Sequence, residues 1–336
     1  MSETILEVKN LRTSFALDEG GQVRAVDDLS YTIKRKEFTA IVGESGSGKS
    51  VSVLSVMRLV NYPPGMIIGG KILYDGKDIL ALDEEEMRRI RGKEIAMIFQ
   101  EPSAAMNPVM KVGDQIGEAI RMHEDISKEE AHKRAIELLR MVDIPNPEER
   151  VNMYPYEFSG GMLQRAMIAM AMSCNPKLLI CDEPTTALDV TVQAQVLEQI
   201  NHLREQFDTT IVLITHNLGV VARYADSVKV MYGGTIVEEG DKMDIFKDPQ
   251  HPYTMGLIKA VPRLDKKSKK LYTIEGEPPD MSKIPLLSCA FADRCAYADD
   301  VCRHKRPTLS QIGEGDHKCA CFHMDKVILE RGEQEA

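Results

Sequence analysis

Eight consecutive residues, Gly43 to Ser50, read Gly-Glu-Ser-Gly-Ser-Gly-Lys-Ser and match the pattern G-x-x-x-x-G-K-[ST] at every fixed position. Glycines let the backbone bring consecutive N–H groups to phosphate oxygens, in conformations that a Cβ would obstruct. The Lys49 ammonium can bind the terminal phosphates, and the Ser50 hydroxyl can ligate a Mg²⁺ ion that bridges them. We therefore expect a nucleotide, ATP with Mg²⁺, to be bound by Gly43, Glu44, Ser45, Gly46, Ser47, Gly48, Lys49 and Ser50.

The flanking residues predict the elements that must position this loop. Phe38–Val42 is a continuous apolar run, which is typical of a buried strand, and Val51–Val60 is typical of an apolar helix. A helix that begins at about Gly48 directs the positive end of its dipole at the phosphates. Strand, glycine-rich loop and helix in this order predict the α/β fold of P-loop NTPases.

Three further polar residues follow predicted strands. Asp182 and Glu183 come directly after the apolar run Leu178–Cys181, and His216 follows Thr210–Thr215. Ligands bind at the carboxyl ends of strands in open α/β sheets, so Asp182 can reach the Mg²⁺ shell and Glu183 can face a water near the terminal phosphate. The alternatives are an exposed acidic turn and a structural histidine.

The N-terminal part predicts a small antiparallel β-subdomain. Ile5–Val8 and Leu29–Ile33 alternate in polarity, and a turn-rich segment lies between them. Phe15 lies at the end of the first strand, where its ring can stack on a nucleotide base. A core position is an equally good interpretation of Phe15.

The middle of the chain predicts an inserted helical subdomain over about 104–172. Its clearest helix begins at Ser127, where Ser127 and Glu130 form a capping box. We expect a nucleotide-binding domain over 1–264 and a C-terminal extension over 265–336. The basic run Lys266–Lys270 is interpreted as a solvated linker, with contact to a membrane surface as the alternative.

Composition excludes several classes of function. The chain has 42 Lys and Arg against 52 Asp and Glu, a net charge of −10, which argues against binding nucleic acid or anionic lipid through overall charge. The N-terminus lacks the layout of a signal peptide, and no apolar run approaches the roughly 18 residues needed to span a bilayer. At a membrane, another chain would have to hold this protein.

Cysteines gather near the C-terminus. Without an export signal we expect a reducing compartment, in which a cysteine cluster is more typical of metal ligands than of disulfides. Four thiolates suit a 4Fe-4S cluster or a tetrahedral zinc ion, and spacing alone does not separate the two. A metal centre would also hold together a segment of few large apolar residues. The cysteines concerned are Cys289, Cys295, Cys302, Cys319 and Cys321.

Together these motifs resemble the nucleotide-binding subunits of ABC transporters over essentially the whole chain. Phe158–Met162 is similar to the family signature Leu-Ser-Gly-Gly-Gln, with its three central residues retained: Ser159, Gly160 and Gly161. The resemblance implies that this segment completes the nucleotide pocket of a facing subunit. Ala187-Leu188-Asp189 matches the loop that crosses the dimer interface in the family. Val51 stands where many members carry a hydroxyl residue, so only its backbone N–H is available to the α-phosphate.

The resemblance also implies roles for residues at the strand ends. Glu183 matches the general base that activates water, and His216 matches the switch residue that contacts the γ-phosphate. Gln100 matches the glutamine that links Mg²⁺ to the transmembrane partner. The Mg²⁺ ligands would then be Ser50, Gln100 and Asp182.

The C-terminal part is similar to the oligopeptide/dipeptide branch of importer ATPases. His251–Thr254, Ala260–Arg263 and Gly276–Pro279 carry this resemblance, and the branch has a cysteine-rich tail. The resemblance favours iron over zinc as the metal, in a 4Fe-4S cluster. The ligands that it implies are Cys289, Cys295, Cys302 and Cys321, with Cys319 as the alternative fourth ligand.

The resemblance implies an ATPase that powers peptide import as a head-to-tail dimer with a paralogous ATPase subunit. Its other partners would be two transmembrane permease subunits and an extracellular or periplasmic substrate-binding protein, with this chain peripheral on the cytoplasmic side of the cell (inner) membrane. Nickel or oligosaccharides are alternative cargoes. The rival class, soluble ABC ATPases of DNA repair, chromosome organisation or translation, fits poorly. Ser50 and Ser159 are too close in sequence to enclose long coiled-coil arms, and only one phosphate-binding motif is present.

Overall fold

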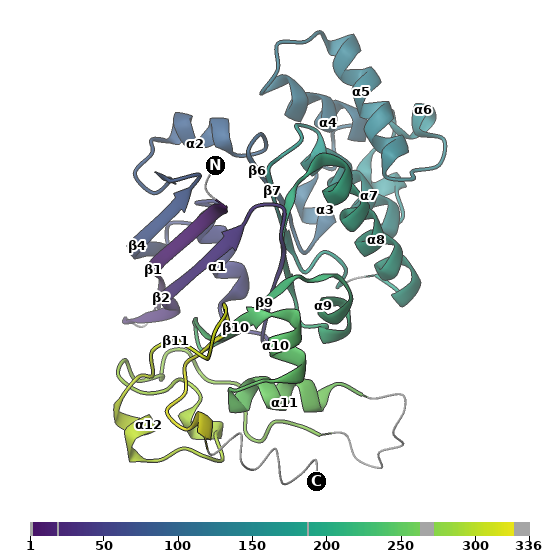
Figure 1. The fold of residues 1–336 in the computed structure, drawn as a ribbon. Coiled ribbons are helices and arrows are strands. Elements are labelled where there is room, and N and C mark those ends of the chain that lie inside the picture. The colour runs from purple at the N-terminus through teal and green to yellow at the C-terminus, as the bar shows by residue number, and fades with distance from the viewer. Residues whose placement is uncertain (1–2, 19, 187, 263–271, 326–336) are drawn as a thin grey trace. The chain divides into compact units, whose positions relative to one another are not determined.

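The computed structural model describes residues 3–18, 20–186, 188–262 and 272–325 of the chain (Figure 1). Ala187 and the basic run Lys266–Lys270 lie outside the described residues. The chain divides into two compact units. As far as they are described, the first comprises Met1–Ile33, Glu37–Leu80 and Ile214–Ala336, and the second comprises Lys34–Lys36 and Ala81–Leu213.

The first unit contains two sheets and the helices packed on them. Its strands are β1 (Thr4–Ala16), β2 (Gln22–Lys34), β3 (Phe38–Val42), β4 (Gly65–Tyr74), β5 (Lys77–Asp78), β9 (Ser227–Tyr232), β10 (Thr235–Asp241), β11 (Ser310–Gln311) and β12 (Lys318–Cys319). Its helices are α1 (Lys49–Val56), α9 (Leu218–Tyr224), α10 (Lys242–Lys247), α11 (Pro252–Ala260), α12 (Asp300–His304) and the 3-10 helix η2 (Ala292–Arg294).

The antiparallel sheet of the first unit confirms the predicted β-subdomain. Its strand order is β2-β1-β4-β5, and β1 pairs with β4 from Leu6 opposite Tyr74 to Phe15 opposite Gly65. Apolar residues from three of these strands are almost fully buried, among them Leu11, Leu29 and Ile72. Burial of these side chains supplies the hydrophobic free energy that holds the sheet in place.

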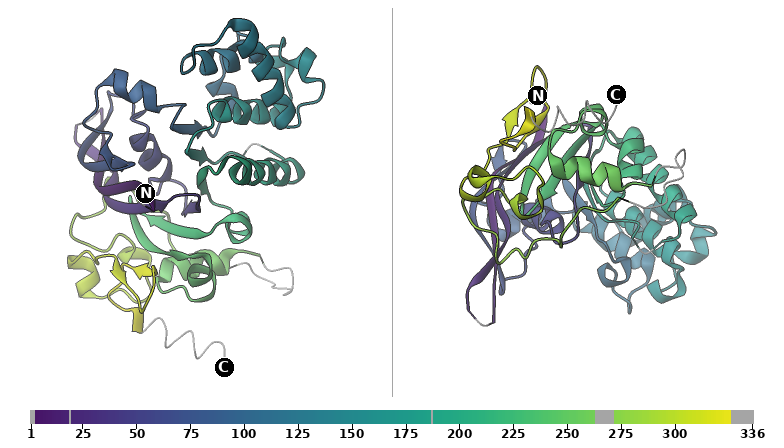
Figure 2. Two further views of the ribbon diagram at one scale, coloured as in Figure 1. Left: turned by 45° about the horizontal axis from the view of Figure 1, so that its top comes forward. Right: turned by 90° about the horizontal axis from the view of Figure 1, so that it is seen from below.

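The other sheet of the first unit carries the phosphate loop. Its strands follow the order β11-β12-β10-β9-β3, with β3 parallel to β9 and β10 antiparallel to β9. All five residues of β3 are buried, as the apolar run predicted. The short strand β12 pairs with β10, so the C-terminal segment (yellow) lies beside the green strand β10 in Figures 1 and 2.

The second unit contains the remaining strands and the helical segment. Its strands are β6 (Ile95–Ile98), β7 (Leu178–Asp182) and β8 (Thr210–Thr215), the last of which leads back into the first unit. Its helices are α2 (Glu84–Ile90), α3 (Pro102–Ala105), α4 (Val112–Arg121), α5 (Lys128–Met141), α6 (Pro147–Arg150), η1 (Pro155–Glu157), α7 (Gly160–Met172) and α8 (Val190–Phe207).

Parallel pairing brings two strand ends of the second unit together. β6 pairs with β7 from Ile95 opposite Leu178 to Ile98 opposite Cys181. All residues of both strands are buried, as expected for a parallel sheet covered on both faces. The residues that follow β6 and β7 therefore emerge at the same edge.

The predicted helix start at Ser127 is confirmed. The Ser127 hydroxyl accepts a hydrogen bond from the Glu130 N–H at 3.2 Å, and the Ser127 N–H donates to the Glu130 carboxylate at 3.0 Å. This capping box satisfies two N–H groups that have no partner inside the helix. Figure 1 shows α4, α5 and α7 grouped together, and they contact one another.

A buried carboxylate fastens the C-terminal segment to the first unit. Glu238 of β10 is fully buried and accepts backbone hydrogen bonds from Gln250 at 2.7 Å and His251 at 2.9 Å. His317 Nε2 lies 2.9 Å from the Glu238 carboxylate. A buried charge needs such partners, and here two segments of the chain supply them.

Two histidines of this cluster titrate in opposite directions. Burial lowers the pKa of His251 to about 4, against the smaller effect of Glu238. Burial also lowers the pKa of His317, but the hydrogen bond to Glu238 and the charges of Glu238, Asp244 and Asp248 raise it overall above its usual 6.5. His317 therefore stabilises the fold fully below about pH 6.5 and loses this contribution as the pH rises through its raised pKa. His251 weakens the fold as the pH falls from about 6.5 towards 4.

We expect His317→Gln to lower the free energy of unfolding at about pH 6 by roughly 1–2 kcal/mol, because it removes a charged hydrogen bond to a buried carboxylate. The difference from wild type should shrink at about pH 9, where the wild-type imidazole has lost its proton. Urea unfolding at both pH values measures this. His304→Gln, at an exposed position of α12, is the matched control and should show no such trend. A His317→Gln difference that stayed constant with pH would contradict the assignment.

Candidate functional site

The predicted phosphate loop packs against backbone at both ends. A Cβ at Gly43 would lie 2.2 Å from the Met231 carbonyl oxygen, and a Cβ at Gly48 would lie 2.2 Å from the Ala25 carbonyl oxygen. Gly48 also has φ +94° and is the N-cap of α1. Around Gly46, with φ +78°, a Cβ would meet nothing within 4 Å. The end glycines permit close packing, and the centre of the loop is open to a ligand.

Lys49 is directed back into the loop. Its ammonium donates hydrogen bonds to the carbonyl oxygens of Gly43 at 2.9 Å and Glu44 at 2.8 Å, and it lies 3.5 Å from the Ser47 hydroxyl. The residue is only 5% exposed. The positive charge is thus held at the concave side of the loop, where phosphate oxygens can replace the carbonyl partners.

Ser50, Val51 and Phe15 lie in the same unit as the loop. Ser50 and Val51 form the first turn of α1, and both are half-buried. Phe15 is half-buried at the end of β1, and a Cβ at Gly65 would lie 2.7 Å from its ring. One edge of the Phe15 ring is therefore packed in the sheet, and part of the ring is accessible to solvent.

In the second unit, parallel strands bring Gln100 to Glu183, both of them predicted site residues. Glu183 directly follows β7 with φ +44°, a left-handed conformation that is unfavourable for a side chain with a Cβ. Its carboxylate accepts hydrogen bonds from the Thr186 hydroxyl at 2.8 Å and the Gln100 amide at 3.5 Å. Asp182, the last residue of β7, is 5% exposed. These contacts fix where the Glu183 carboxylate lies.

His216, in the first unit, directly follows β8 and is exposed. The next residue, Asn217, caps α9 by accepting hydrogen bonds from the backbone of Gly219 at 3.0 Å and Val220 at 3.3 Å. This cap fixes the chain immediately after His216.

Two helix starts of the second unit lie side by side. Ser159 caps α7 by accepting a hydrogen bond from the Met162 N–H at 3.3 Å, and Asp189 caps α8 in the same way. A Cβ at Gly161 would lie 2.8 Å from the Val192 side chain, and one at Gly160 would lie 4.0 Å from Leu188. Ser159, Gly160 and Asp189 are exposed, and Gly161 is half-buried.

Three residues contact these groups although nothing in the sequence indicates the contacts. Thr186 donates to Glu183, while Tyr253 and Arg294 contact Glu44 of the phosphate loop. Thr186 is close to Glu183 in the chain, but threonine in a turn is too common to indicate a role. Tyr253 and Arg294 reach the loop only through the tertiary fold.

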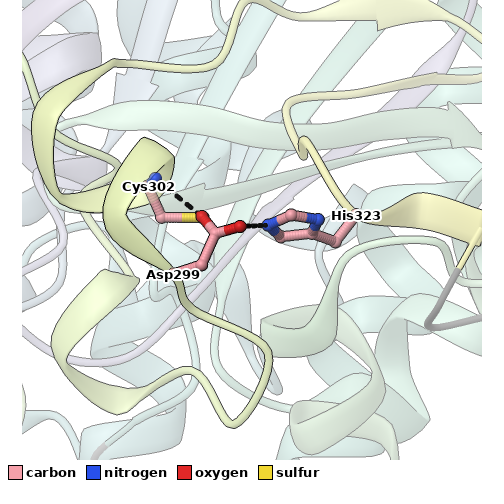
Figure 3. A group of neighbouring side chains, drawn as sticks. All are labelled: Asp299, Cys302 and His323. Atoms are coloured by element: carbon pink, nitrogen blue, oxygen red, sulfur yellow. Dashed lines mark hydrogen bonds and ion pairs between the residues drawn. The ribbon is translucent and has the colours of Figure 1, made fainter.

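The cysteine-rich segment contradicts the predicted cluster. Among the residues that the structure describes, the His, Cys, Asp and Glu side chains close enough to share a metal ion are Asp299, Cys302 and His323 (Figure 3). The four-cysteine set, Cys289, Cys295, Cys302 and Cys321, shares only Cys302 with this group. The alternative fourth ligand, Cys319, is buried outside it.

The Asp299 group is explained as a helix cap. One carboxylate oxygen of Asp299 accepts hydrogen bonds from the backbone of Val301 at 3.0 Å and Cys302 at 3.2 Å, which starts α12. The other oxygen lies 3.0 Å from His323 Nε2. In addition, burial raises the pKa of the Cys289 thiol to about 12 and that of Cys321 to about 11.

Two family models match the chain. Residues 26–186 match the family described as ABC transporter, and residues 237–302 match the family described as oligopeptide/dipeptide transporter, C-terminal region.

None of the helices in the described ranges is long and apolar enough to cross a membrane.

Relatives match over nearly the whole chain. The oligopeptide transport ATP-binding protein OppD of Bacillus subtilis is 52% identical over 97% of this chain and 91% of its own length. OppD of Salmonella typhimurium is 46% identical over 98% of this chain and 96% of its own length. The dipeptide transport ATP-binding protein DppD of Bacillus subtilis is 48% identical over 96% of both chains.

These comparisons also bear on the cluster. The descriptions of the matched families and relatives refer to transport and ATP binding, and they do not include an iron–sulfur cluster. Together with the helix-cap geometry at Asp299, this overturns the predicted 4Fe-4S cluster and its zinc alternative. The prediction was wrong because cysteine spacing indicates which thiols are near in sequence, and not which side chains converge in space.

Solved structures support the fold and the kind of site. The dimeric bacterial ABC transporter cassette MJ0796 covers 70% of this chain with a TM-score of 0.63 and 28% identity, and 98% of that cassette is matched. The same cassette, solved in a post-hydrolysis state bound to ADP and Pi, matches equally well, with 27% identity. The phosphate loop, the full-length relatives and the cassette fold agree, and the chain belongs to the ABC transporter family, in its oligopeptide/dipeptide branch of ATP-binding proteins.

Proposed function

We propose that this protein binds and hydrolyses Mg²⁺-ATP to power the import of peptides through a membrane transporter. The observation that carries the proposal is the phosphate loop with its buried Lys49, in a chain that is similar to peptide transport ATP-binding proteins over nearly its whole length. The chain is then an ABC nucleotide-binding domain over 1–264, with the helical subdomain at about 104–172, followed by an extension over 265–336.

The phosphate loop binds the triphosphate in this proposal. The backbone N–H groups of the loop and the start of α1 supply hydrogen-bond donors, and Lys49 supplies the charge for the terminal phosphates. The open space at Gly46, where a Cβ would meet no atom, fits a ligand that approaches the backbone closely. Phe15, partly exposed at the end of β1, is the candidate to stack on the base.

Ser50, Gln100 and Asp182 are the proposed Mg²⁺ ligands, because hydroxyl, amide and carboxylate oxygens suit this ion. When bound, Mg²⁺ neutralises charge on the phosphates. Asp182 offers the carboxylate of this donor set at the carboxyl end of β7, the strand end at which ligands bind in α/β sheets.

Glu183 is the proposed general base. Its carboxylate is oriented by hydrogen bonds from Thr186 and Gln100, and its left-handed backbone turns it away from the path of β7. A carboxylate held in this way can accept a proton from the attacking water. His216, exposed just past β8, is the proposed contact to the γ-phosphate.

The signature segment completes the pocket of a second subunit in this proposal. Ser159, Gly160 and Gly161 present the start of α7 to solvent, and Asp189 presents the start of α8 beside it. Free N–H groups at a helix start attract phosphate, so this surface suits the nucleotide of a facing subunit. That the related cassette MJ0796 is solved as a dimer supports this arrangement.

The names of the relatives support the wider assembly. Oligopeptide and dipeptide transport imply permease subunits in the membrane and a substrate-binding protein outside it. We propose that a paralogous ATPase faces this chain in a head-to-tail dimer, and that the pair lies on the cytoplasmic face of the cell membrane.

Glu183→Gln should slow ATP hydrolysis by about 10²–10⁴-fold while ATP binding persists, because the amide positions water but cannot accept its proton. The assembled transporter in vesicles is assayed for phosphate release and for uptake of a labelled oligopeptide, and both rates should fall together. Glu137→Gln, on the exposed face of α5, is the matched control. Turnover near the wild-type rate would remove Glu183 from its role.

Lys49→Ala should weaken ATP binding by at least about tenfold, because it removes a charge that contacts the terminal phosphates. Equilibrium binding of a fluorescent ATP analogue to the full chain, in the presence of Mg²⁺, measures this. Lys133→Ala, exposed on α5, controls for loss of a lysine. Equal affinity of the Lys49→Ala and wild-type proteins would place the nucleotide elsewhere.

A further inference from the structure

The phosphate loop contains an acidic side chain at an unfavourable place. Glu44 is the second residue of the loop, next to Gly43, and its carbonyl oxygen accepts a hydrogen bond from the Lys49 ammonium. A triphosphate bound by this loop brings several negative charges close to the Glu44 carboxylate. Unless that carboxylate is neutralised, the repulsion weakens nucleotide binding.

Arg294 neutralises this carboxylate from the C-terminal region, which here means residues 272–325. Its two terminal nitrogens contact the two carboxylate oxygens of Glu44, at 2.6 and 3.1 Å. The Arg294 side chain is only 6% exposed and that of Glu44 is 25% exposed. A two-pronged contact between charged groups is among the stronger hydrogen-bonded pairs, and partial burial limits its screening by salt.

The Arg294 side chain is built into the C-terminal region. Its Nε donates to the Glu275 carbonyl oxygen at 3.0 Å, and its guanidinium lies 5.8 Å from the Tyr232 ring centre and 6.0 Å from that of Phe291. Hydrogen bonding to Glu44 is the main cause that raises the pKa of Arg294. The group is therefore a permanent, oriented charge, and it is not a flexible surface arginine.

Tyr253 of α11 holds the backbone of Glu44 in place. The Tyr253 hydroxyl accepts a hydrogen bond from the Glu44 N–H at 2.8 Å. The Tyr253 ring packs against Tyr232 and Phe291, with ring centres 4.6 and 5.4 Å apart. Glu44 is thus fixed through its side chain and its backbone, and its carbonyl oxygen in turn positions Lys49.

The end of the phosphate loop at Gly48 is also supported by an arginine, through strand β2. Arg306 contacts the Asp27 carboxylate at 2.8 Å and donates to the Asp27 carbonyl oxygen at 2.7 Å. Two residues earlier in the chain, the Ala25 carbonyl oxygen lies 2.2 Å from the position that a Cβ on Gly48 would take. Arginines of the C-terminal region therefore support the start of the loop directly and its end through β2.

We propose that Arg294 is a positioning residue for nucleotide binding. It neutralises Glu44 and, with Tyr253, holds the start of the phosphate loop, so that the C-terminal region sets the affinity of the loop for ATP. Tyr253 and Arg294 fall within the match to the oligopeptide/dipeptide C-terminal region, and Glu44 falls within the match to the ABC transporter family. The inference rests on the proposed ATP site and gives the C-terminal region a function in it.

Binding of the fluorescent ATP analogue to the full chain tests this proposal. Arg294→Ala should weaken binding about tenfold or more, because it leaves the Glu44 carboxylate unpaired beside the phosphates. The loss should shrink as salt is raised, since repulsion between partly exposed charges is screened. Adding Glu44→Gln to Arg294→Ala should recover most of the affinity, because the repelling charge is then gone.

The kinetics of ATP hydrolysis by the assembled transporter distinguish a positioning role of Arg294 from a general loss of structure. Arg294→Ala should raise KM for ATP much more than it lowers kcat. Arg303→Ala removes an exposed arginine of the same region, paired with Asp293 at the surface, and should change neither value. Arg294→Lys keeps the charge without the two-pronged contact and should lose less affinity for ATP than Arg294→Ala. If Arg294→Ala does not fold, Arg294→Lys takes its place in both measurements.

Four results would overturn the proposal: wild-type affinity in Arg294→Ala, a loss unaffected by salt, no recovery in the double variant, or an Arg294→Lys loss as large as that of Arg294→Ala. Its failure is distinguishable from failure of the ATP site. If wild type and Lys49→Ala bind the analogue equally, the proposed function fails. If these two differ while Arg294→Ala binds as wild type does, only the role of Arg294 fails.

Discussion

The phosphate loop depends on close contact between three pieces of backbone. Gly43 lies against the carbonyl of Met231 in β9, and Gly48 lies against the carbonyl of Ala25 in β2, each at a separation that excludes any Cβ. This contact holds the loop in the shape that exposes its N–H groups, since glycine alone would leave it flexible. The strands β2, β3 and β9 therefore hold the phosphate loop in shape as well as forming part of the hydrophobic core.

The C-terminal region extends this support. Strand β12 joins the sheet beside β10, and the buried carboxylate of Glu238 joins that sheet to the start of α11 and to His317. From this anchored position, Arg294 and Arg306 contact the residues that border the phosphate loop. Burial of the Glu238 network makes the region a rigid support, because breaking it would leave a charge without partners in the core.

In the second unit, parallel pairing of β6 with β7 positions two of the proposed site residues. The two strands end at the same edge, so Gln100 and Glu183 meet although they are far apart in the sequence. The left-handed backbone of Glu183 is a cost that the buried strand β7 and the hydrogen bond from Thr186 offset. The catalytic carboxylate of our proposal is thus positioned by secondary structure.

The sequence by itself determined the local elements and the residue types of the site. The glycine pattern of Gly43–Ser50, the apolar run of β3 and the capping box at Ser127 depend on neighbours in the chain, and each was predicted. The side chains that contact Glu44 could not be predicted, because Tyr253 and Arg294 come from segments that only the sheet and α11 bring to the loop. The same reason explains the error over the cysteines. Their spacing is a local property, whereas convergence on a metal ion is decided by packing, which places Asp299 and His323 beside Cys302.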